Sequence, residues 1–93
     1  MTLLLNLAKE FGVSIEITKA GNVHVYDPKC TKEGTHFSWY PKSGAFRKTI
    51  QTFLYGLCIN MNATNINTEA QAYELFKKRI LKYRNPLLKQ FCS

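Results

Sequence analysis

The chain has 93 residues, is 45% hydrophobic and 13% aromatic, and carries a formal net charge of +7. Its length leaves room for one domain only, and its apolar content excludes an intrinsically disordered chain. We therefore expect a single folded domain over residues 1–93, as a monomer or a homodimer.

The positive charge is confined to the second half of the chain. Residues 1–41 hold four lysines and four acids, whereas residues 42–93 hold nine bases and two acids. Clustered cations gain affinity for phosphate backbones by releasing counterions, so this asymmetry favours a nucleic acid or an acidic protein surface as partner. A merely solubilising surface remains the alternative.

The cysteines and the amino-terminal residues indicate where the chain resides. Cys30, Cys58 and Cys92 are widely spaced and form no Cys-x-x-Cys pair, so neither a disulfide framework nor a zinc site is expected. The apolar run over 3–8 lacks a basic flank and is too short to cross a bilayer. We expect reduced thiols, a cytoplasmic location and no membrane partner.

The first half of the chain reads as a helix followed by three strands. Apolar residues recur at helical spacing over 2–11, and Gly12 stands where a helix-capping glycine belongs. Residues 13–18 and 23–26 then alternate apolar and polar around a turn at 20–22, which predicts an antiparallel hairpin. Residues 36–40 form the expected third strand, which ends at a proline.

The second half reads as two helices. An apolar stripe at helical spacing predicts a helix over about 43–60, formed by Phe46, Ile50, Phe53, Leu54 and Leu57. An asparagine-rich loop follows, and Thr68 with Gln71 fits a capping box that opens a helix ending near 85–86. The expected fold class is α+β, a small three-stranded antiparallel sheet with helices packed on one face, in the order α-β-β-β-α-α.

The alternation in the strands predicts one apolar and one polar, aromatic face of the sheet. Tyr26, His36 and Tyr40 fall on the polar face, where aromatic side chains can stack on bases or contact a protein. Strand propensity alone also explains tyrosines at such positions.

The start of the expected middle helix is the strongest candidate for phosphate binding. Free backbone amides, the helix dipole, a hydroxyl and three cations would converge there. The residues concerned are Lys42, Ser43, Gly44, Arg47 and Lys48. The last helix and the tail would add a second basic row, Lys78, Lys82, Arg84 and Lys89. Cations near a helix carboxyl end are also stabilising without a partner.

Catalysis has little support in the sequence. No His-Glu-x-x-His or Gly-x-Ser-x-Gly pattern is present, and no nucleophile has a base beside it. His24 and His36 on adjacent strands, with Asp27 or Cys30 nearby, form a weak alternative as a metal or acid/base site. We expect a non-enzyme without cofactor or metal.

The order helix, three antiparallel strands, helix over residues 2–60 resembles a double-stranded-RNA-binding domain. That resemblance implies that cations at the start of the second helix, here 43–48, contact phosphates across a groove. The segment 22–28 is similar to the second strand and turn of integrase arm domains, and three strands plus a helix resemble plant AP2-type domains.

Two functions follow as hypotheses. The first is a non-catalytic nucleic-acid-binding module that uses both basic segments and the aromatic face. The second is a small inhibitor or adaptor, of the kind that mobile elements or viruses encode, which binds an acidic or nucleic-acid-binding surface of a larger protein. A homodimer held by an exposed sheet edge would be compatible with either.

Overall fold

A computed structural model describes residues 2–30, 34–42, 47–55 and 57–84. Within these ranges the fold is α+β, with two helices and one five-stranded antiparallel sheet. The elements are α1 (Thr2–Phe11), β1 (Ser14–Ile17), β2 (Val23–Tyr26), β3 (His36–Tyr40), β4 (Thr49–Leu54), β5 (Leu57–Ala63) and α2 (Glu69–Arg84). The strands are neighbours in chain order, β1-β2-β3-β4-β5, so the sheet is a simple meander.

The helix expected over 43–60 is wrong, because this segment contributes the hairpin of β4 and β5. Along β4 the side chains of Ile50, Thr52 and Leu54 are buried on the helix side of the sheet, so the true period is two. The stripe of apolar residues fitted a helical period only by coincidence, since the segment is rich in the β-branched and aromatic residues that favour strands. The observed order is therefore α-β-β-β-β-β-α, with five strands instead of three.

This order also removes the basis of the topological resemblances. The resemblance to a double-stranded-RNA-binding domain depends on a helix that follows the third strand, and the resemblance to AP2-type domains depends on a sheet of three strands plus a helix. Here β3 is followed by β4, which pairs with it from His36↔Phe53 to Tyr40↔Thr49. The register leaves a two-residue connection between β4 and β5, where Tyr55 adopts a φ of 55° as such tight turns require.

The predictions for the first half of the chain are confirmed. The helix α1 ends at Phe11, and Gly12 follows with a φ of 70° while its amide donates to the Ala8 carbonyl at 2.9 Å. Strands β1 and β2 form the expected hairpin, closed by a hydrogen bond of 2.9 Å from the Thr18 amide to the Asn22 carbonyl.

The capping box at the start of α2 is also confirmed. The Gln71 amide donates to the Thr68 hydroxyl at 3.2 Å, and the Thr68 amide donates to the Gln71 side-chain oxygen at 3.1 Å. This reciprocal pair satisfies amides that the first helical turn leaves without partners.

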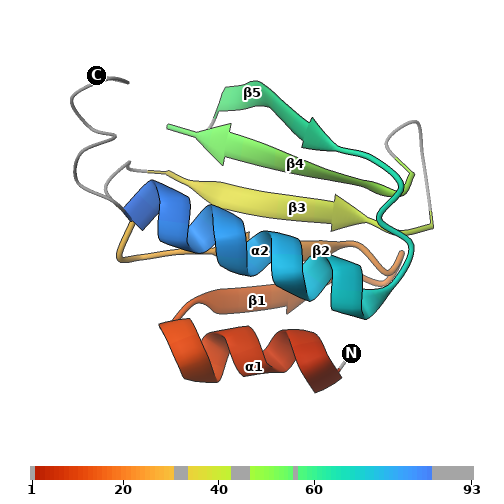
Figure 1. Cartoon of the computed structure of the whole chain (residues 1–93), viewed down its shortest axis with the longest axis horizontal. Helices are drawn as coiled ribbons and strands as arrows, with labels where there is room; N and C mark the ends of the chain where they lie inside the picture. Colours follow the sequence, from red (N-terminus) through yellow and green to blue (C-terminus); the bar gives the residue numbers. More distant parts are fainter. Residues whose placement is uncertain (1, 31–33, 43–46, 56, 85–93) are drawn as a thin grey trace.

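Both helices contribute to one core on the near side of the sheet in Figure 1, where α2 lies across the sheet and α1 runs beside it. Phe37 of β3 meets Phe76 and Tyr83 of α2, with ring centroids 6.5 and 6.1 Å apart. The helices are joined by hydrogen bonds from the Leu4 amide to Glu69 (2.7 Å) and from the Tyr73 hydroxyl to Glu10 (2.5 Å). The buried apolar side chains are Leu4, Leu7, Val13, Val23, Val25, Phe37, Trp39, Ile50, Leu54, Ala72, Phe76, Ile80 and Tyr83.

Neither helix covers the opposite side of the sheet, which we call the open face. In the described part of the chain, no helix is long and apolar enough to span a bilayer.

Candidate binding site on the open face

The open face carries a row of three rings that crosses three adjacent strands. Register pairs place Tyr26 of β2 beside His36 of β3, and His36 beside Phe53 of β4. The His36 and Phe53 rings are stacked, with centroids 4.4 Å apart and planes only 5° from parallel. Tyr26 continues the row at 5.2 Å from His36, with its plane tilted by 31°. These three residues are called the ring row below.

A second group of polar and aromatic residues connects the ring row to the far end of β3. The His24 ring lies 6.5 Å from Tyr26 and 6.2 Å from Tyr40, which it meets edge to face. Its Nδ1 is 2.7 Å from the Ser38 hydroxyl, and this hydrogen bond orients the imidazole. A continuous path of aromatic and imidazole rings therefore runs along the open face from Tyr40 to Phe53.

The environment of His36 favours its neutral form. Burial lowers the pKa of His36 below the usual 6.5, and the positive potential of His24 lowers it further. A hydrogen bond between Nδ1 and the Gly34 carbonyl, at 3.4 Å, opposes the shift. A neutral imidazole is the form that stacks on Phe53 without the cost of desolvating a charge.

Gln51 stands beside the ring row with an unsatisfied amide. It is only 4% exposed and pairs in register with Ser38, and its side-chain oxygen accepts a hydrogen bond from the Cys58 thiol at 3.4 Å. Its Nε2 makes no hydrogen bond with any described residue. An unsatisfied buried amide costs about 1–3 kcal/mol.

Four exposed cations gather at one end of the sheet. In an antiparallel meander, the β1–β2 turn and the β3–β4 connection lie at the same end, on the right in Figure 1. The turn carries Lys19, and the connection carries Lys42, Arg47 and Lys48, all of them exposed. We call these four residues the basic end. It adjoins Tyr40, because Tyr40 pairs with Thr49 at this end of β3.

The helix start that was expected to bind phosphate does not form. Arg47 and Lys48 lie in a turn that leads directly into β4, and Lys48 has a φ of 63°. Helix amides and a helix dipole are therefore not available beside these cations. Ser43 and Gly44 lie outside the described residues. The three expected cations are nevertheless brought to one end of the sheet, as exposed side chains on loops.

The basic residues of α2 lie on other surfaces. Lys78 and Lys82 are exposed on the helix, and α2 packs on the side of the sheet opposite the ring row. The fold thus separates them from Tyr26, His36 and Tyr40, although the sequence predicts that all of these residues serve one binding function. Lys89 lies outside the described residues.

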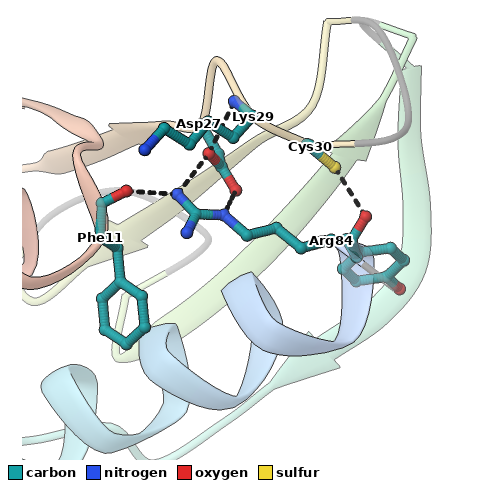
Figure 2. Close-up of polar contacts among 6 residues, drawn as sticks. Phe11, Asp27, Lys29, Cys30 and Arg84 are labelled. Carbon is teal, nitrogen blue, oxygen red and sulfur yellow. Dashed lines mark hydrogen bonds and ion pairs between the residues drawn. The ribbon is translucent and has the colours of Figure 1, made fainter. Parts of the chain in front are cut away.

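Arg84 is engaged inside the protein, as Figure 2 shows. Its guanidinium forms an ion pair with Asp27 through two contacts of 2.8 Å and also donates to the Phe11 carbonyl. The bond to Asp27 raises the pKa of Arg84. Beside this pair, the Cys30 thiol donates to the Tyr83 carbonyl at 3.0 Å. Arg84 therefore ties the ends of α1 and α2 to the β2–β3 connection and is poorly placed to bind an external phosphate.

The metal alternative is not supported by the described residues, among which no three His, Cys, Asp or Glu side chains are grouped to hold an ion. His24 and His36 lie on the open face, whereas Asp27 and Cys30 are used in the contacts with α2.

Three residues of the site are not among the binding residues that the sequence predicts. Phe53 lies in the segment for which the sequence predicts a helix. His24 falls on the predicted polar, aromatic face but is not among the predicted binding residues, and Lys19 carries no binding prediction. The alternation Thr49, Gln51, Phe53 was the available signal for a strand, but it was too short to outweigh the competing helical stripe.

Comparison with known proteins gives no relative from which a function could be inferred. The chain matches no protein-family model, and no curated protein or solved structure is significantly similar to it.

Proposed function

We propose that this protein binds nucleic acid through the open face and the basic end, without catalysing a reaction. The observation that carries the proposal is the path of rings that starts at Tyr40, beside the basic end, and finishes at the ring row. Rings offer stacking surfaces to bases, and exposed cations attract the phosphates that join them.

The length of β3 fits an interface that joins the basic end to the ring row. From Tyr40 to His36 the open face extends over four residues of β3, which is about 13 Å at the rise of an extended strand. Phosphates at the basic end and bases at the ring row could therefore belong to one short stretch of polynucleotide.

A matched pair of charge variants tests which surface binds. The first removes the three cations of the β3–β4 connection, Lys42→Gln, Arg47→Gln and Lys48→Gln. The second removes three exposed cations of the helices, Lys9→Gln, Lys78→Gln and Lys82→Gln, so that both variants have the same net charge.

Fluorescence polarisation with labelled single-stranded and duplex DNA and RNA, at about 50 and 200 mM salt, provides the readout. We expect weaker binding in the first variant and near wild-type binding in the second. The reverse result would place the interface on the helices, and equal loss in both would mean that only net charge matters.

The adaptor hypothesis keeps one supporting observation. At the opposite end of the sheet, the β4–β5 hairpin exposes 53% of Tyr55 and 71% of Leu57. Exposed apolar residues at a hairpin tip suit contact with a protein better than contact with phosphates. In that case a Leu57→Ser variant should lose a nuclease-resistant protein complex, while nucleic-acid affinity stays unchanged.

A further inference from the structure

The ring row ends next to a small, exposed residue. One face of the Tyr26 ring is directed toward His36, and the next position across the sheet is Ser14 of β1, the register partner of Tyr26. Ser14 is exposed, and Tyr26 keeps 42% of its surface accessible. On the side away from His36, Tyr26 therefore lies beside Ser14, whose side chain is too small to continue the row.

A nucleobase has the size and shape to continue it. Neighbouring strands are about 4.8 Å apart, which is close to the 4.4 and 5.2 Å between the rings already in the row. A base above Ser14 would thus meet the Tyr26 ring at a stacking distance. The rings are held in place by each other, so little further ordering is needed when a base binds.

We infer that the position above Ser14 is a slot for one unpaired base, which stacks on the outer face of Tyr26. The inference rests on the proposed function and adds the class of nucleic acid, which is single-stranded. Bases inside a duplex are covered on both faces by their neighbours, so a duplex must first extrude a base to use the slot.

Glu16, two residues after Ser14 on β1, determines which base the slot prefers. Its side chain is therefore the next one on the same side of the strand as a base in the slot. Glu16 is exposed and lies on the same side of β1 as Ser14. Its carboxylate accepts hydrogen bonds from an exocyclic amino group, such as N4 of cytosine, and repels the carbonyl O4 of thymine at the same position.

Filling or removing the stacking surface tests the slot. Ser14→Trp places an aromatic side chain where the base would lie, and Tyr26→Ala removes the ring on which it would stack. With labelled oligodeoxycytidine of about 12 nucleotides, each should weaken binding by roughly 5- to 150-fold, the value of one base–aromatic stack. The matched controls Ala70→Trp and Tyr55→Ala, at exposed positions away from the slot, should bind like the wild type.

The role of Glu16 is tested by comparing two pyrimidine oligonucleotides whose bases stack similarly. The wild type should bind oligodeoxycytidine more tightly than oligodeoxythymidine of the same length. In Glu16→Gln the difference should disappear, because an amide can pair with either base. Equal affinities in the wild type would overturn the assignment of base class.

The outcomes separate this inference from the function on which it rests. Binding that is lost on removal of Lys42, Arg47 and Lys48, but is unchanged in Ser14→Trp and Tyr26→Ala, retains the proposed function and rejects the slot. Tighter binding of duplex than of single strands also rejects the slot. Failure of every oligonucleotide to bind at low salt rejects both.

Discussion

Positively charged residues of α2 have different roles in this protein because their surroundings differ. Lys78 of α2 is exposed, whereas its neighbour Arg79 is only 8% exposed and donates to the hydroxyl of Thr52 on β4. Burial lowers the pKa of Arg79, while the ion pair with Asp27 raises that of Arg84. A count of cations along α2 therefore overestimates the charge that this helix presents to a partner.

His36 should make stability sensitive to mild acid. Its folded pKa lies below 6.5, so the unfolded chain takes up the proton more readily, and stability should decrease as the pH falls from 6.5 toward the folded pKa. The variant His36→Phe keeps a ring in the ring row but cannot take up a proton, so this loss of stability at low pH should be absent from it. Urea denaturation midpoints at about pH 7.5 and 5.5 measure the effect. The same pH dependence in both proteins would contradict it.

Tyr73 should titrate later than an ordinary tyrosine. Its hydrogen bond to Glu10 is the main cause that raises its pKa from 10.0 to about 12. Because the folded pKa is the higher one, the stabilising contribution is complete below pH 10 and is lost as the pH rises toward 12. Ultraviolet difference titration of the wild type against Tyr73→Phe isolates this phenol. In Glu10→Gln the Tyr73 pKa should return toward 10.0.

At the scale of elements, the segment from residue 47 to residue 63 shows how a local pattern can support two structures. In a helix, one face would hold the apolar residues Ile50, Phe53, Leu54 and Leu57. In the strand β4, Ile50 and Leu54 also share one face. Pairing with β3 decides between the two, because it satisfies the backbone of β4 and buries Ile50 against Trp39. That pairing partner is not part of the local pattern.

The ion pair between Asp27 and Arg84 should be a main support for the arrangement of the elements. The Asp27 side chain is fully buried, so Asp27→Asn leaves the positive charge of Arg84 without compensation and should destabilise the protein by about 3 kcal/mol. Chemical denaturation measures the loss. Adding Arg84→Met should recover part of it, since the unpaired charge is removed.

Lys78→Met on the exposed side of α2 is the matched control and should change stability by no more than about 0.5 kcal/mol. A similar loss from Lys78→Met and Asp27→Asn would show that the ion pair has no special role.

At the scale of the whole molecule, the sheet separates two basic surfaces, the helix side with Lys78 and Lys82 and the basic end beside the open face. The proposed interface therefore uses only part of the charge of +7.

The salt dependence of binding should reflect this division. Three phosphate contacts contribute about 2 to the slope of log affinity against log salt for a single strand. The triple variant of Lys42, Arg47 and Lys48 should lower the slope by about that amount, whereas the triple variant of Lys9, Lys78 and Lys82 should leave it unchanged. Titrations at several salt concentrations give both slopes, and equal slopes would remove the distinction between the surfaces.

The sequence by itself determined the elements whose signals are local. The glycine after α1, the turn between β1 and β2, and the capping box at Thr68 each specify their boundary through the conformations and hydrogen bonds of adjacent residues. Tyr26 and His36 were placed together on a polar face for the same reason, because alternation along a strand is a local property.

Only the tertiary structure decided the rest. The strands β4 and β5, the inclusion of Phe53 in the ring row, and the meeting of Lys19 with Lys42, Arg47 and Lys48 depend on pairing between distant segments. The tertiary structure also decided which arginines face inward, since Arg84 is paired with a carboxylate 57 residues away in the chain. Such contacts bring together residues that no short window of sequence contains, and their free energy outweighs the local helical preference.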